Sequence, residues 1–98
     1  MNKLYQTVCI EKNEKDIKFN TQTKYPIHIN HDKNHLIGYA KIKWWRRNSL
    51  YADLHINIVV ESEMTLYPSI GYSDGELREI GLCSQRNVDE TINPIKIK

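Results

Sequence analysis

Histidine is the residue type in this chain best suited to metal binding or proton transfer. Three of the four histidines lie close together, at His28, His31 and His35. Imidazole is the commonest zinc ligand in proteins and titrates near neutral pH, so this group has two potential uses. However, no cysteine is nearby, and a fourth ligand would have to come from a distant segment. We therefore expect no metal site and no cofactor. His55 lies on the polar face of a later strand and is expected to be exposed.

The two cysteines, Cys9 and Cys83, are far apart in the sequence and match no zinc-ligand spacing. The first six residues contain no apolar h-region, so a secretory signal peptide is not expected. A chain that stays in the reducing cytosol keeps its thiols free. We therefore predict two reduced, buried thiols.

The sequence Trp44-Trp45-Arg46-Arg47 is the strongest candidate for a binding surface. Neighbouring strand residues point to opposite faces, so one Trp can join the core while the other is at least partly exposed. Exposed Trp and Arg are enriched in interface hot spots. The alternative is that one arginine merely stacks on a Trp of the same hairpin. Nearby lysines would suit single-stranded nucleic acid, but the basic patch is small. We therefore do not expect a nucleic-acid partner.

A period-two alternation of apolar residues dominates the chain and predicts strands. Residues 50–60 show it most clearly, and residues 36–45 form another β-branched and aromatic run. The polar residues 46–49 suit a turn between them. The sequence therefore predicts a long hairpin over residues 36–60, with Leu54, Ile56 and Ile58 buried.

Further short strands are expected on either side of this hairpin. Residues 4–10 and 17–20 are predicted to pair as a second hairpin. Only residues 61–66 suggest a helix, and Pro68 would end it. The remaining predicted strands cover residues 25–29, 67–72 and 77–84. About seven short strands in so small a chain favour a closed or nearly closed antiparallel barrel.

Composition sets the limits on this fold. The chain has 98 residues, of which 40% are hydrophobic, and a formal net charge of +2. This length suits one domain over residues 1–98. No apolar stretch approaches the roughly 20 residues of a membrane-spanning helix, so no membrane partner is expected. The net charge is too small to imply nucleic-acid binding.

Three segments of the chain stand out in order: Pro-Ile-His-Ile-Asn-His-Asp at 26–32 with Leu-Ile-Gly-Tyr-Ala at 36–40, Tyr-Pro-Ser-Ile-Gly-Tyr at 67–72, and Leu-Arg-Glu-Ile-Gly-Leu at 77–82. Together they resemble the prohead proteases of tailed bacteriophages. In that family an Asn-His-Asp loop precedes a strand with an aliphatic-glycine pair, and a Ser-aliphatic-Gly-aromatic strand and a Glu-aliphatic-Ser-Leu strand follow. The resemblance covers residues 25–85. It implies a small, mainly β antiparallel barrel related to the prohead protease and the herpesvirus assemblin-like barrel, with little helix.

The resemblance also implies an active site. His31 matches the catalytic histidine of the family, Ser69 the nucleophile, and Glu79 the glutamate that opens the third motif. The residue types fit the chemistry, because a serine hydroxyl becomes nucleophilic when an imidazole takes its proton and a third polar group orients that imidazole. Asp32 is expected to act as a local turn residue and not as a member of this group.

Some positions depart from the family pattern. Gly81 stands where the family has a serine, Gln-Arg-Asn at 85–87 replaces a Pro-Ala-Asn turn, and the helix before the serine strand is reduced to residues 61–66. These departures favour a virion structural protein, an auxiliary or decoration protein that kept the fold and binds the major capsid protein, another virion protein or a second copy of itself. It would reside in the virion, and in the host cytoplasm during assembly. The alternative is a minimal active serine prohead protease that cleaves capsid or scaffold proteins; a phage-encoded inhibitor of a host system has no supporting motif.

Overall fold

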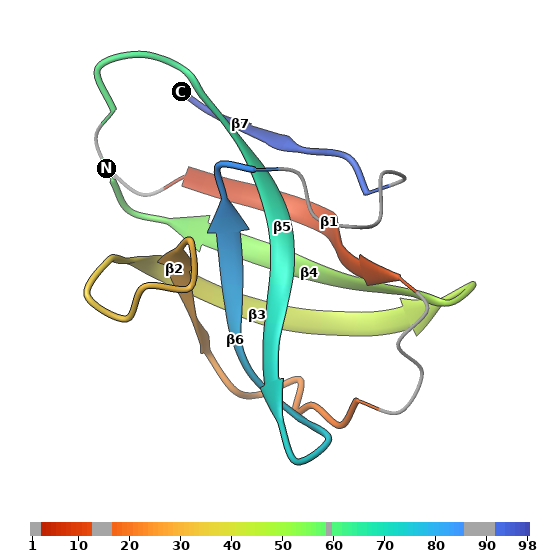
Figure 1. Cartoon of the computed structure of the whole chain (residues 1–98). Helices are drawn as coiled ribbons and strands as arrows, with labels where there is room; N and C mark the ends of the chain where they lie inside the picture. Colours follow the sequence, from red (N-terminus) through yellow and green to blue (C-terminus); the bar gives the residue numbers. More distant parts are fainter. Residues whose placement is uncertain (1–2, 13–16, 59, 86–91) are drawn as a thin grey trace.

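Seven β-strands make up the secondary structure of the computed structural model, which describes residues 3–12, 17–58, 60–85 and 92–98 (Figure 1). No helix is present within these ranges, so the chain is mainly β as predicted. The strands are β1 (Lys3–Lys12), β2 (Tyr25–Ile29), β3 (Leu36–Arg46), β4 (Ser49–Ile56), β5 (Met64–Ser73), β6 (Glu76–Cys83) and β7 (Ile95–Ile97).

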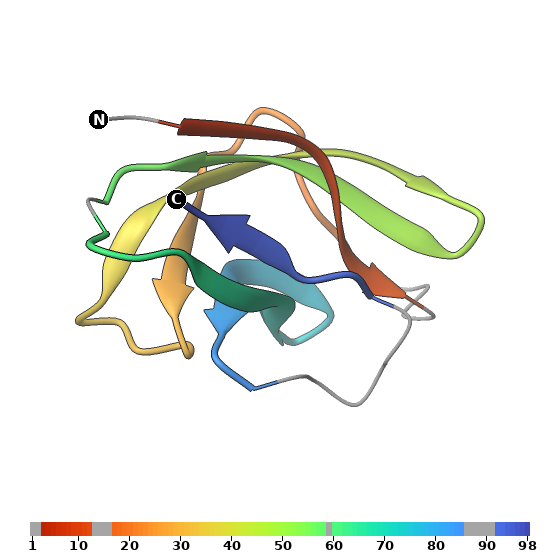
Figure 2. The ribbon, with the colours of Figure 1, turned by 90° about the horizontal axis from the view of Figure 1, so that it is seen from above.

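The strands form one sheet in the order β1-β4-β3-β2-β6-β5-β7. Every neighbouring pair is antiparallel except β2 and β6, which are parallel. The sheet curls so that β5 and β7 lie across the core from β1 and β4 (Figure 2). Among the described residues no ladder joins the edge strands β1 and β7. The architecture is thus a curled half-barrel with one parallel pair. The sequence predicts a closed or nearly closed antiparallel barrel, so the parallel pair and the only partial closure are departures from that prediction.

The predicted long hairpin is the β3–β4 pair. Arg46 pairs with Ser49, and the two residues between them, Arg47 and Asn48, have φ angles of 51° and 63°. Two successive positive φ angles are the geometry of a type I′ turn, whose twist matches that of the strands. Leu54 and Ile56 are buried as predicted. Strand β4 ends at Ile56, so Ile58 lies beyond the hairpin and only packs against the margin of the core.

The hairpin predicted over residues 4–20 does not form. Strand β1 pairs along its length with β4, because its apolar residues find their partners on the long hairpin. Residues 17–20 make only an isolated bridge, in which Lys18 pairs in parallel with Glu76 at the start of β6. Most of the segment between these two predicted strands, residues 13–16, lies outside the described residues.

The predicted helix at residues 61–66 is also absent. Met64 begins β5, and residues 64–66 pair with β7. Six residues are too few for a stable isolated helix, whereas Leu66 in an extended chain reaches the core and is buried. Pro68 lies within this strand as one of its buried side chains and does not end it.

The core fills the inside of the curl, with Ile27, Leu54, Ile80 and Leu82 fully buried. Because strand residues alternate between faces, the residues between these core positions point to the outer face of the sheet. The outer face of β2, β6 and β5 carries the candidate site described next.

Candidate active site

Ser69 lies in the middle of β5 on the outer face of the sheet. Its neighbours Pro68 and Ile70 are buried on the inner face, so the strand alternation turns the Ser69 side chain outward. Ser69 pairs with Gly81 on β6. The residue beside Ser69 on β6 is therefore a glycine, which has no side chain.

His31 lies in the tight loop between β2 and β3. Asn30 and His31 have φ angles of 51° and 57°, and the Asp32 amide donates a 2.9 Å hydrogen bond to the Ile29 carbonyl. Asp32 also accepts a hydrogen bond from the Asn34 amide, as expected of a turn residue. Left-handed conformations at residues other than glycine are uncommon and often occur at functional sites.

Asn30 ties this loop to the end of β6. The Asn30 amide donates a 3.0 Å hydrogen bond to the Leu82 carbonyl, and Asn30 Oδ1 accepts hydrogen bonds from the Ser84 amide and hydroxyl at 2.9 and 3.4 Å. These hydrogen bonds fix the loop beside β6, the strand that pairs with the Ser69 strand β5. His31 is thereby placed over Gly81.

Two glycines provide the space that the site occupies. A Cβ atom at Gly81 would lie within 2.6 Å of both ring nitrogens of His31, and one at Gly71 would lie 2.5 Å from Cγ of Glu79. The serine that the prohead pattern has in place of Gly81 would therefore collide with the ring in its present position. In this chain Gly81 admits the histidine, so this departure from the family pattern is no evidence against an active site.

The three predicted catalytic residues meet in one hydrogen-bonded chain. His31 Nε2 lies 3.2 Å from Ser69 Oγ, and His31 Nδ1 lies 3.2 Å from Glu79 Oε2. They come from three separate segments: a loop, β5 and β6. The arrangement of nucleophile, base and orienting carboxylate is that of a serine hydrolase triad.

His28 is a fourth member that the sequence did not place in the site. Its Nδ1 lies 2.7 Å from Glu79 Oε1, so the two carboxylate oxygens of Glu79 face two different histidines. The ladder between β2 and β3 has an irregularity between Ile27 and His28. The extra residue of this irregularity is Ile37 on β3, so β2 keeps its alternation and His28 lies on the outer face with Pro26. The short spacing of His28 and His31 in the sequence suggests only a metal site, because nothing in it shows that β6 pairs with β2 and brings Glu79 to His28.

The chemistry of Glu79 decides which histidine nitrogens carry protons. An ionised carboxylate only accepts hydrogen bonds, so Nδ1 donates from both His28 and His31. A neutral His31 protonated on Nδ1 has its lone pair on Nε2, where it accepts the hydroxyl proton of Ser69. This is the protonation state that a general base for Ser69 requires.

Cys83 lies near the same carboxylate but is a poor nucleophile. Burial raises the pKa of the Cys83 thiol, and the negative charge of Glu79 raises it further. The thiolate is the reactive form of cysteine, and both causes disfavour it. Cys9 and Cys83 are both free thiols, each only partly buried.

No group of three His, Cys, Asp or Glu side chains suited to a metal ion occurs in the described part of the chain. His28 and His31 share the carboxylate of Glu79 instead. Within the described residues no helix is long and apolar enough to cross a membrane.

The residues at the tip of the β3–β4 hairpin lie at the opposite end of the molecule from the His31 loop (Figure 1). Trp44 is 44% exposed, whereas Trp45 packs partly buried against the core, so the predicted division of the pair is confirmed. The cation over the Trp44 ring is Lys43, whose Nζ lies 4.9 Å from the ring centre. Arg46 and Arg47 lie at the tip and line a hollow together with Trp45 and Asn48.

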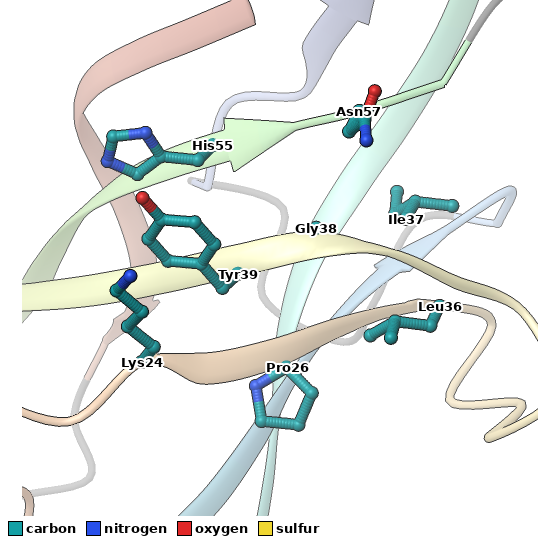
Figure 3. A pocket seen from close by; sticks show the side chains of 8 residues that line it. All are labelled: Lys24, Pro26, Leu36, Ile37, Gly38, Tyr39, His55 and Asn57. Atoms are coloured by element: carbon teal, nitrogen blue, oxygen red, sulfur yellow. The ribbon is translucent and has the colours of Figure 1, made fainter. Parts of the chain in front are cut away.

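A shallow pocket occupies the outer face where β2, β3 and β4 adjoin (Figure 3). Pro26 and Leu36 line one side of it, and Tyr39 lies between Lys24 and His55. The Tyr39 and His55 rings stack with centres 4.4 Å apart, so His55 is partly covered and not simply exposed. Because Pro26 and His28 belong to the same strand, the pocket and the triad share one face of the sheet.

The chain was compared with protein-family models, with curated proteins and with solved structures, and none of the three comparisons gave a match.

Proposed function

We propose that the chain is a minimal serine endopeptidase of the prohead-protease type, which cleaves capsid or scaffold proteins during head maturation. The observation that carries this proposal is the continuous hydrogen-bonded chain from Ser69 through His31 to Glu79. Sequence departures had favoured a protein that lost this machinery. The retained geometry favours the active alternative, and the resemblance over residues 25–85 supplies the substrate class.

The proposed reaction begins with attack of Ser69 Oγ on the carbonyl carbon of the scissile peptide bond. His31 Nε2 takes the hydroxyl proton as the bond forms, and Glu79 stabilises the resulting imidazolium through Nδ1. The imidazolium then gives its proton to the leaving amine as the C–N bond breaks, which leaves an acyl group on Ser69. Water attacks this ester in the second half-reaction as His31 takes a proton from it; the bond from the acyl carbon to Ser69 Oγ then breaks, His31 returns the proton to Oγ, and the acid product leaves.

The pocket of Figure 3 supports binding of an extended peptide on the same face. Leu36 is 62% exposed at its edge, and such a large exposed aliphatic side chain is a candidate contact for apolar substrate side chains. Neighbouring strands are spaced about 4.8 Å apart, so the pocket lies within the span of a few extended residues from the triad.

The test is labelling of the purified chain with a serine-directed fluorophosphonate, followed by mass spectrometry. We expect one adduct, on Ser69, and cleavage of a capsid or scaffold precursor by the unlabelled protein. Ser69→Ala should abolish both, whereas Ser73→Ala, at the exposed end of the same strand, should alter neither. If the folded wild-type chain neither reacts with the fluorophosphonate nor cleaves the precursor, the proposed peptidase function is ruled out.

The second candidate is an auxiliary capsid protein that docks on the major capsid protein. The exposed Trp44 at the hairpin tip favours it, since a large aromatic residue with a cation over its ring is typical of an interface anchor. The two functions use opposite ends of the molecule, so docking through the tip would leave the triad accessible. In either case the expected location is the virion, and the host cytoplasm during assembly.

A further inference from the structure

We propose that His28 is a positioning residue of the active site: it holds one oxygen of Glu79 so that the other faces His31. The consequence for catalysis rests on the proposed peptidase function. The linkage of the two histidines through Glu79 is a separate claim, which can be measured without substrate.

The geometry divides the carboxylate unequally. The bond from His28 Nδ1 to Glu79 Oε1 is 2.7 Å long, whereas the bond from His31 Nδ1 to Oε2 is 3.2 Å long. The His28 side chain is 10% exposed and that of Glu79 is 16% exposed, compared with 32% for His31. The shorter, more buried contact is therefore the one made by His28. His28 therefore anchors the carboxylate on its more buried side, through Oε1, while the more exposed His31 bonds to Oε2.

The location of His28 explains why it can do this and little else. It lies on β2 opposite Gly81 in the parallel ladder with β6, so its backbone is held within the sheet. Within the described residues it makes no hydrogen bond to Ser69 or to His31. It acts on the reacting groups only through Glu79.

A glutamate needs such an anchor more than an aspartate does. Its longer side chain has an additional rotatable bond, and at this position Glu79 lies across the bare backbone of Gly71, with no side chain there to enclose it. A donor fixed on β2 restricts the carboxylate to one orientation. That orientation keeps the Nδ1 proton of His31 bonded and leaves Nε2 free to accept from Ser69.

The first experiment compares His28→Leu with His28→Asn. Asparagine presents an amide donor close to the position of Nδ1, whereas leucine fills similar space without a donor. We expect His28→Leu to lower kcat and the rate of fluorophosphonate labelling roughly 10- to 100-fold, the usual effect of losing a group that orients a reacting one, with KM for a peptide substrate nearly unchanged. His28→Asn should retain a rate within a few-fold of wild type. Equal rates for wild type and the leucine variant would refute the positioning role, and equal losses in both variants would indicate packing alone.

The second experiment is proton NMR of the Ser69→Ala protein, which needs no activity. Imidazole protons held by a carboxylate resonate at unusually low field, and we expect one from His31 and one from His28. Adding His28→Leu should remove the His28 signal and also shift or broaden the His31 signal, while adding His28→Asn should leave the His31 signal in place. A His31 signal that is indifferent to His28→Leu would overturn the proposed linkage. An inactive wild-type protein that still shows the linkage would count against the peptidase and not against this inference.

Discussion

At the residue scale, the site depends on two glycines that lack side chains as much as on its four functional side chains. Gly71 and Gly81 leave the outer face of β5 and β6 bare, and the side chains of Glu79 and His31 occupy that space. The resemblance to prohead proteases pointed to His31, Ser69 and Glu79 in advance. It could not indicate that Gly81 is required by the His31 ring, because that follows only from the three-dimensional position of the loop.

We predict that Gly81→Ser displaces His31 and lowers the fluorophosphonate labelling rate of Ser69 at least about 10-fold, since small displacements of reacting groups have effects of this size. The strand itself should persist, because the added side chain points outward. Gly75→Ser provides the comparison: its Cβ meets no atom within 4 Å, although its φ of 74° makes the substitution strained. That variant should lose some stability and keep its labelling rate. An unchanged rate in Gly81→Ser would mean that the ring can move aside without consequence.

A second residue-scale prediction concerns Cys83. The negative charge of Glu79 contributes to the raised pKa of this thiol, so Glu79→Gln should lower the pKa and increase the thiolate fraction at mildly alkaline pH. Alkylation of Cys83 by iodoacetamide at pH 8 should therefore accelerate several-fold in the variant. The rate at Cys9 should stay constant, because burial raises the pKa of that thiol and Glu79 is not among the groups that shift it. Equal Cys83 rates in both proteins would contradict the proximity of the two side chains.

At the element scale, the sequence predicts a local hairpin better than it predicts which distant strands pair. The β3–β4 hairpin could be predicted because the alternation of β4 is regular and the turn between the two strands is polar. The pairing of β1 with β4 could not, because an alternating strand specifies which face is apolar and not which strand lies beside it. The role of His28 was missed for the same reason, because alternation predicts its face but not that β6, which carries Glu79, pairs with β2.

The hairpin supplies a direct stability test. Leu54 is completely buried in the core, so Leu54→Asp would place an unpaired charge there and cost several kcal/mol, a large share of the roughly 5–15 kcal/mol that stabilises a typical domain. We expect circular dichroism to show a protein without stable sheet structure at 25 °C. Tyr51→Asp, on the outer face of the same strand, should remain folded. A cooperative thermal transition in Leu54→Asp close to that of wild type would contradict the assigned core.

At the scale of the whole molecule, the half-barrel separates two surfaces. The triad lies on the outer face of β2, β6 and β5, and the Trp44 tip extends from the far end of β3 and β4 (Figure 1). A small domain with both features can hold a partner at one end and present the nucleophile at the other. Composition alone indicated neither surface, because a net charge of +2 does not select a partner.

We predict different effects for the two tryptophans in a particle-decoration assay. Trp44→Ala removes a 44% exposed ring and should weaken binding to capsids by about 2 kcal/mol or more with little change in thermal stability. Trp45→Ala removes packing against the core and should act mainly on stability. Charge reversal at Arg46 and Arg47 should slow association and alter its salt dependence. If both folded tryptophan variants coat capsids like wild type, the tip is not the docking surface.

The parallel pairing of β2 with β6 also determines when the site can exist. His28 and Glu79 are 51 positions apart along the chain, and the whole β3–β4 hairpin and β5 must be made before β6 can join β2. Contacts of such long range form late in folding, because the intervening loop must first be ordered. A nascent chain on the ribosome, or one truncated before β6, therefore contains the nucleophile and its base but cannot hold them together. The proposed protease would therefore be inert until β6 has been made and has joined β2.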